Sequence, residues 1–181
     1  MTQHWLQDIA LSPLNMAAAR KRVALIGASQ LDKSEVPPFD DPTWDIWSCN
    51  SLWKLCRDKD HRFRADHWFE MHPLSVQTEQ ERIDMDDCPV PLYVLGEPLM
   101  GHWDTYPLDA VRAKFGARDY FTCTMAYQMA LALLLGYETI GLWGMELWQG
   151  SARERTCELR CLEHWMGIAR GMGVHVVLPD Y

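Results

Sequence analysis

The chain has 181 residues, of which 48% are hydrophobic and 23% are charged, and its formal net charge is −8 at pH 7. A chain of this length normally forms one domain and can bury a proper core. The negative charge argues against general nucleic-acid binding, which needs a basic face to neutralise phosphates. A small anionic ligand is still compatible with it, because local geometry can create a binding site.

The six cysteines form no CxxC pair, and most lie in apolar segments, where a reduced thiol behaves as a small hydrophobe. We therefore expect a reducing cytosol and no zinc site. The longest apolar run is interrupted by Tyr127, Gln128 and Gly136 and falls short of the roughly 18 residues of a membrane span. The N-terminus also lacks the pattern of a signal peptide. These features predict a cytoplasmic protein without a membrane partner.

Residues 1–22 carry a weak helical pattern that ends in a basic patch, and we interpret them as an N-terminal arm. Residues 23–181 then form the single α/β domain. The apolar run Val23–Ile26 predicts a first buried strand, and the small residues Gly27 and Ser29 in the turn after it would let a ligand approach the backbone. This turn matches neither the GxGxxG dinucleotide fingerprint nor a P-loop.

A proline-rich loop over residues 30–42 follows the first strand. Its Asp40 and Asp41 could cap a turn or serve a metal, and we favour the turn. Trp44–Ser48 is expected to be the second strand, with Asn50 at its carboxyl end and a helix from Ser51 to about Arg57. The Asn50 amide suits a base or a ribose, although forming a turn explains it nearly as well.

The third expected strand, Asp66–Met71, alternates in a way that places Glu70 and His72 on the same face. These two side chains can therefore converge. A carboxylate beside a histidine can be an acid–base pair or half of a metal site, and a structural hydrogen bond explains it about as often.

The next segments predict an outer helix over residues 75–87, a short strand over 92–95 and a helix over Leu108–Phe115. Residues 99–107 look irregular and aromatic, and we expect them to form a lid that contains Trp103 and Tyr106. We interpret most of the nine tryptophans as core residues.

The segment from Thr122 to Gly150 organises the rest of the chain. Residues 125–135 are apolar nearly all round, which is typical of a buried helix, and Thr122 or Thr124 can cap its start. Gly136 ends this helix, and Thr139–Trp143 is expected to be a buried strand. A helix that leads into a buried strand implies a parallel sheet, which binds ligands beyond the carboxyl ends of its strands.

A last helix over Glu154–Gly171, with Cys157 and Leu159 among its buried positions, leads to a closing strand over Val174–Leu178. The expected fold is thus a single three-layer Rossmann-like α/β domain with a mostly parallel central sheet of about six strands. Gly144 and Glu146 should lie at the mouth of its site.

The stretch from Tyr127 to Gln149 resembles the core of the small bacterial CMP-sialic acid sialyltransferases. In that family an alanine-rich helix leads to a GYxxI turn and a strand that is followed by an acid and a Tyr-Gln pair; the matching residues here are Gly136, Tyr137, Ile140, Gly144, Glu146 and Gln149. Gly27 to Ser29 and Asn50 are similar to the family's glycine-rich turn and second-strand asparagine. Pterin pyrophosphokinase-like domains share this pattern.

The loop at Phe39–Pro42 and the strand at Asp66–His72 also resemble bacteriophage proteins whose activity the resemblance does not reveal. If the chain is encoded by a phage, its expected location is the cytoplasm of the bacterial host.

The resemblance implies a cradle for a CMP-type nucleotide or a nucleotide sugar. Gly27 and Ser29 would lie near phosphates, Asn50 on the sugar or base side, Thr122 and Thr124 at a helix N-terminus suited to an anion, and Glu146 on the ribose or base. The family's histidine base falls on Arg153, its tyrosine on Trp148 and its arginine near Phe121, where Arg118 could act instead.

Three hypotheses follow, together with the simpler one of an interaction protein with a tryptophan-rich surface. The first is a glycosyltransferase-like enzyme with Glu70 or His72 as the replacement base. The second is a nucleotide-binding sensor or sequestering protein without turnover. The third is a metal-dependent phosphohydrolase that uses Asp40, Asp41, Glu70, His72 and Glu146. A small nucleotide-derived ligand is the expected partner, and a homo-oligomer is compatible with the sequence.

Overall fold

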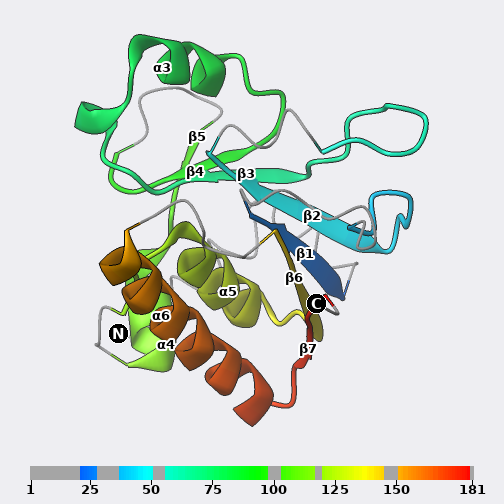
Figure 1. Cartoon of the computed structure of the whole chain (residues 1–181), viewed down its shortest axis with the longest axis vertical. Helices are drawn as coiled ribbons and strands as arrows, with labels where there is room; N and C mark the ends of the chain where they lie inside the picture. Colours follow the sequence, from blue (N-terminus) through cyan, green and yellow to red (C-terminus); the bar gives the residue numbers. More distant parts are fainter. Residues whose placement is uncertain are drawn as a thin grey trace, which may run out of the picture.

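The computed structural model describes residues 21–27, 37–50, 56–97, 103–116, 120–144 and 151–179. These residues form an α/β fold around a parallel sheet (Figure 1). The described strands are β1 (Arg22–Ile26), β2 (Trp44–Cys49), β3 (His67–Glu70), β4 (Leu92–Val94), β5 (Trp103–Thr105), β6 (Thr139–Trp143) and β7 (His175–Val177). The described helices are η2 (Leu74–Val76), α3 (Glu79–Asp86), α4 (Leu108–Phe115), α5 (Thr124–Leu135) and α6 (Ala152–Gly171).

The sheet has seven strands in the order β5-β4-β3-β2-β1-β6-β7, and every neighbouring pair is parallel. From β1 the chain moves outward through β2, β3 and β4 to β5, and then returns to place β6 on the other side of β1. The strand order therefore changes direction between β1 and β6, which is the position where parallel α/β sheets bind ligands. The predicted fold class is confirmed, with seven strands where about six were expected.

Both faces of the sheet are buried. Helices α4, α5 and α6 cover one face (Figure 1), and the larger apolar core lies between them and the sheet. The second core includes side chains from α3 and from the loops that precede β2 and β3, namely Phe39, Cys56, Ala65 and Met85. Six of the nine tryptophans are described and all six are buried, which confirms the core interpretation for Trp44, Trp47, Trp68, Trp103, Trp143 and Trp165.

The central helix α5 forms as the sequence predicts. Its residues are buried from Met125 to Leu133 apart from Tyr127, and Gly136 ends it in the left-handed conformation at φ 84°. Tyr137, from the turn that resembles the sialyltransferases, donates its hydroxyl to the buried Asp45 carboxylate on β2. This hydrogen bond fixes the turn to the sheet.

Four predictions about local structure were wrong. The expected lid contains β5, in which Trp103 is buried, and Tyr106 beside it is buried too, because this segment pairs with β4 as an edge strand. Cys123, not a threonine, is the N-cap of α5. Arg57 forms an isolated bridge with Phe63, so the helix expected after Ser51 does not reach it. Cys157 and Leu159 are exposed, because α6 packs through a narrow stripe that contains Cys161, Leu162, Trp165, Met166 and Ala169.

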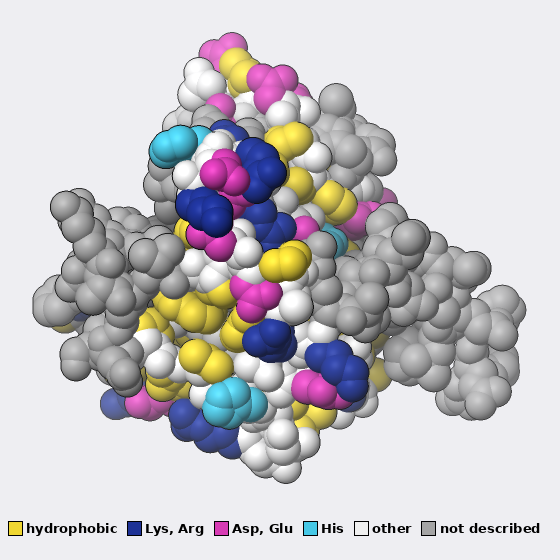
Figure 2. All heavy atoms as spheres, turned by 90° about the vertical axis from the view of Figure 1, so that its right-hand side faces the viewer, with side chains coloured by type: hydrophobic (Ala, Val, Ile, Leu, Met, Phe, Trp, Pro, Cys, Tyr) yellow, Lys and Arg dark blue, Asp and Glu magenta, His cyan; other side chains and the backbone are white. Residues whose placement is uncertain are grey.

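Charges of both signs are mixed on the face shown in Figure 2, where described Lys and Arg side chains lie next to Asp and Glu side chains. Ion pairs among the described residues include Arg62 with Asp58, at 2.8 Å, and Lys21 with Glu138. Within the described part of the chain, no helix is both long enough and apolar enough to cross a bilayer.

The end of β1 leaves no room for a side chain at Gly27, since an added Cβ would lie 2.2 Å from the Gly144 carbonyl oxygen. We predict that Gly27→Ala lowers the free energy of unfolding by about 1–3 kcal/mol, because two strand ends would have to separate. Gly167→Ala, in α6, is the matched control because its Cβ meets no atom within 4 Å, and it should not destabilise the fold. Urea unfolding measures both; a Gly27→Ala variant as stable as Gly167→Ala would contradict this account.

His67 is 5% exposed, and its ring lies near those of Trp47 and Tyr93. Burial lowers the pKa of His67 to about 4. The unfolded chain therefore takes up a proton near pH 6.5 that the folded chain does not, so stability falls as the pH drops. We predict that lowering the pH from 6.5 to 5 removes about 1.6 kcal/mol of unfolding free energy. His67→Phe should flatten this slope in urea titrations, whereas His175→Gln, at an exposed position, should leave it unchanged.

Candidate functional site

The carboxyl ends of β1 and β6 are closely packed. The Gly27 amide donates a hydrogen bond to the Trp143 carbonyl at 2.7 Å, and Met125 at the start of α5 lies beside the same glycine. The Gly144 carbonyl leaves no space for a side chain at position 27, and this alone explains why the residue is a glycine. Its predicted role beside a phosphate stays a prediction, and the predicted Ser29 and Glu146 lie outside the described residues, as do Arg118 and Trp148.

The N-terminus of α5 points to this edge of the sheet and is not capped by a side chain. Its N-cap residue, Cys123, makes no side-chain capping bond, and the first turn contains no acid. By contrast, α3 and α6 each begin with a complete capping box. The Ala126 amide already donates to the Cys123 carbonyl at 3.1 Å. The positive end of the helix dipole, with no acid in the first turn, still favours a bound anion.

The two threonines predicted at this helix end differ in their surroundings. The Thr122 hydroxyl donates a hydrogen bond to the Cys157 carbonyl at 3.1 Å and so ties the segment before α5 to α6. Thr124 is the first residue of the helix and is partly exposed. Of the two, Thr124 is therefore better placed to meet a ligand at the helix N-terminus.

A cavity of about 120 Å³ lies at the carboxyl ends of β2 and β3. It brings together three predicted site residues, Asn50, Glu70 and His72, and is lined in addition by Trp68, Gln77, Glu81, Asp84 and Met85. Asn50 has a left-handed backbone at φ 50°, which asparagine tolerates better than most residues. Its buried Oδ1 has no hydrogen-bond partner among the described residues. Asn50 thus lines the cavity, with its amide oxygen buried.

Glu70 and His72 are in direct contact, as the strand alternation predicts. Glu70 Oε1 lies 2.6 Å from His72 Nδ1 and also accepts the His72 backbone N–H at 3.2 Å. The Glu70 side chain is 6% exposed, whereas that of His72 is 55% exposed. A carboxylate at Nδ1 favours the tautomer with its proton on that nitrogen, which leaves Nε2 as the acceptor. This is the arrangement of a general base with an orienting acid.

Carboxylates from two helices surround His72 at longer range. Glu81 of α3 has a lowered pKa, mainly through its hydrogen bonds with Thr78 and to a lesser extent through the charge of His72. Glu158 of α6 has a raised pKa because it is partly buried and lies near Glu154, and His72 partly offsets this rise. With Glu70 and Asp84 in the same cavity, this end of the site is acidic. It therefore favours hydroxyl groups or cations and disfavours phosphate.

The ligand set of the phosphohydrolase hypothesis does not assemble. Asp40 and Asp41 lie before β2, at the opposite edge of the sheet from Glu70 and His72, so these four cannot share an ion. Asp41 accepts the Thr43 amide at 2.9 Å, which confirms its interpretation as a turn residue. Asp40 instead accepts the Lys59 amide at 3.0 Å, 19 residues further along the chain. The described residues contain no group of three or more His, Cys, Asp or Glu side chains that could hold a metal.

Sequence reasoning missed several residues that line or adjoin the site. Gln77, Glu81 and Asp84 belong to the segment that was expected only to form an outer helix, and nothing in its polar pattern indicates a cavity. Gln128 is fully buried in α5, donates to the Ser48 carbonyl at 3.0 Å, and has no partner for its Oε1 among the described residues. In the sequence, Gln128 could have been recognised because it is the one side-chain amide in a mostly apolar helix.

Comparison with known proteins places this geometry in context. No protein-family model matches the chain, and no curated protein matches it in sequence. The structure is similar to the monofunctional α-2,3-sialyltransferase Cst-I from Campylobacter jejuni, with a TM-score of 0.51, 14% identity, and coverage of 88% of this chain and 76% of that one. The chain has a sialyltransferase-like fold.

A second similar structure is the sialyltransferase CstII from Campylobacter jejuni in complex with cytidine-5′-monophosphate, with a TM-score of 0.47 and 15% identity. That match covers 87% of this chain and 79% of the other.

Arg153 stands where the sequence resemblance expects the family's histidine base. It is an exposed residue in the first turn of α6.

Proposed function

We propose that the chain binds a nucleotide sugar at the carboxyl edge of the sheet and transfers the sugar to an acceptor hydroxyl, with Glu70 and His72 as the acid–base pair. The observation that carries this proposal is the 2.6 Å contact between Glu70 and His72 in a cavity beside Asn50. The sialyltransferase-like fold and the sequence resemblance support the choice of a CMP-type donor.

The distribution of charge at the carboxyl edge of the sheet indicates how the nucleotide sugar would be oriented there. The α5 N-terminus, without an acid in its first turn, suits the donor phosphate, whereas the acidic cavity around His72 suits hydroxyl groups. In the proposed step His72 Nε2 takes the proton of the acceptor hydroxyl, whose oxygen attacks the anomeric carbon of the donor sugar. The bond from that carbon to the phosphate oxygen breaks, and the nucleotide leaves with the electron pair. Glu70 stabilises the imidazolium that forms.

His72→Gln and Glu70→Gln test the catalytic pair. We predict that either change lowers the release of CMP from CMP-sialic acid by about 10²–10⁴-fold, because the proton acceptor or its orienting partner is lost. Since His72 is half exposed, His72→Gln should keep the wild-type melting temperature. His175→Gln, at an exposed edge-strand position, is the control and should retain activity. Equal turnover in wild type and both site variants would rule out this assignment.

A binding protein without turnover is the second candidate. Two observations favour it: Glu70 also holds the backbone amide of His72, which is a structural role, and Arg153 stands where the resembling family has its base. In this case the wild-type protein would bind CMP or a CMP sugar and release no product from any donor tested. Detection of turnover would exclude this candidate.

Nucleotide binding itself can be measured by thermal shift. A nucleotide at about 100 times its dissociation constant should raise the melting temperature by roughly 5–10 °C for a chain of this size. We predict that Thr124→Glu removes most of this shift, because a carboxylate in the first turn of α5 would repel the phosphate. Thr156→Glu, which adds the same charge to the exposed surface of α6, should retain it. A flat response to cytidine, uridine, adenosine and guanosine nucleotides, or an undiminished shift in Thr124→Glu, would contradict the anion site.

A further inference from the structure

Two cysteine side chains meet where the start of α5 packs on α6. Cys123, the N-cap residue of α5, is half-buried and packs against the larger core, to which the buried Cys161 of α6 belongs. The two thiols share a hydrogen bond. Both are free cysteines, and the proposed transfer reaction makes no use of either.

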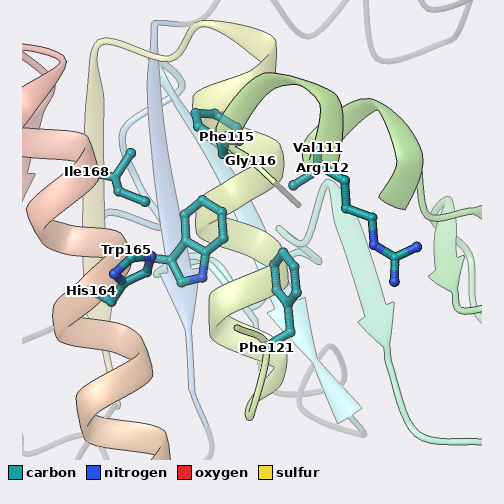
Figure 3. Close-up of a pocket in the computed structure, with 8 residues that line it drawn as sticks. All are labelled: Val111, Arg112, Phe115, Gly116, Phe121, His164, Trp165 and Ile168. Atoms are coloured by element: carbon teal, nitrogen blue, oxygen red, sulfur yellow. The ribbon is translucent and has the colours of Figure 1, made fainter. Parts of the chain in front are cut away.

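Contacts on both sides of the two cysteines hold the segment before α5 against α6. The Cys161 thiol donates to the Tyr120 carbonyl at 3.0 Å, and Trp165, one turn further along α6, donates its indole N–H to the same carbonyl at 2.9 Å. The Trp165 ring also stacks on Phe121, two residues before Cys123, with 5.2 Å between centroids (Figure 3). These contacts keep the two thiols together without a covalent bond.

The contact makes the two thiols unequal as acids. Hydrogen bonds from Cys123 and from Thr122 lower the pKa of Cys161 to about 6, although burial acts in the opposite direction. The bond to Cys161, together with burial, raises the pKa of Cys123. By contrast, burial raises the pKa of Cys56 to about 12 and that of Cys88 to about 11. The thiolate is the form that attacks a disulfide, so the pair is more reactive than these two cysteines.

We propose that Cys123 and Cys161 form a reversible disulfide when the protein meets a low-molecular-weight disulfide such as oxidised glutathione. Cys123 passes its proton to the Cys161 thiolate and attacks one sulfur of the oxidant, whose other sulfur leaves as a thiolate. Cys161 then loses that proton, attacks the Cys123 sulfur and displaces the second glutathione. The two protein thiols are oxidised by two electrons, and the oxidant is reduced to two molecules of glutathione.

The disulfide would replace a hydrogen bond between the N-cap of α5 and the middle of α6 with a covalent link. In a reducing compartment such a pair is reduced at rest and oxidised only transiently. Neither cysteine lines the cavity that contains Glu70 and His72. The proposal therefore goes beyond the proposed transfer reaction and does not depend on it.

Peptide mapping after oxidation tests the proposal. The full chain carrying Cys157→Ser is the starting protein, because Cys157 is exposed and would react independently of the pair. After incubation with oxidised glutathione at neutral pH, this protein should lose two thiols. A tryptic digest without reductant should contain the peptide 119–153 linked to the peptide 161–170. Dithiothreitol should restore both thiols and separate the two peptides.

Two further variants of the starting protein distinguish the roles of the cysteines. Cys161→Ser should leave Cys123 as a stable glutathione adduct, since no second thiol displaces it. Cys123→Ser should abolish the linked peptide and leave the buried Cys161 without an adduct. The buried Cys56 and Cys88 are internal controls and should keep free thiols in every sample.

The starting protein alone decides the question if a further variant fails to fold. Absence of the linked peptide after oxidation, or a link that joins other cysteines in its place, would overturn the proposal. An adduct on Cys123 that persists while Cys161 is present would overturn it as well, because the second thiol would then be unable to reach the first.

Discussion

The structure depends on the contact between the ends of β1 and β6. A backbone hydrogen bond from Gly27 to Trp143 joins them, and the Gly144 carbonyl occupies the space that a side chain at position 27 would need. Because the strands are parallel, the ends of β2 and β3 lie at the same edge of the sheet as this contact, and Met125 at the start of α5 lies beside it. Polar residues that are far apart in sequence are thereby brought to one side of the molecule.

The charges at this edge divide it into two regions. The first turn of α5 lacks acids and a side-chain cap, whereas the cavity at Glu70 also contains Glu81 and Asp84. A free phosphate fits the first region and would be repelled by the second. The proposed nucleotide-sugar ligand, with a phosphate at one end and hydroxyl groups at the other, would match both regions. The overall charge of −8 is compatible with anion binding because the attractive groups are local backbone amides.

The parts of the fold that the sequence predicts well are those with long, regular apolar patterns. Helix α5 and strands β1 and β6 are buried along most of their length, so their hydrophobicity alone identifies them. The contact of Glu70 with His72 follows from strand alternation. Strand β5 could not be recognised, because three residues carry no periodicity and pairing with β4 comes only from tertiary structure. The contribution of α3 to the cavity could not be predicted for the same reason: its polar residues line the cavity only through the tertiary position of the helix.

A comparison of two buried carboxylates indicates which one is held for structure alone. The side chains of Asp58 and Glu70 are equally buried, each 6% exposed. Asp58 accepts the amides of Asp60 and Arg62 and the Arg62 guanidinium, so donors from its own tight loop satisfy both of its oxygens. The hydrogen bonds of Glu70 described here come from the backbone and ring of His72, whose side chain is half exposed and faces a cavity. In the proposed transfer, the contact with the accessible His72 imidazole would couple the buried Glu70 carboxylate to the acceptor hydroxyl, as general-base catalysis requires.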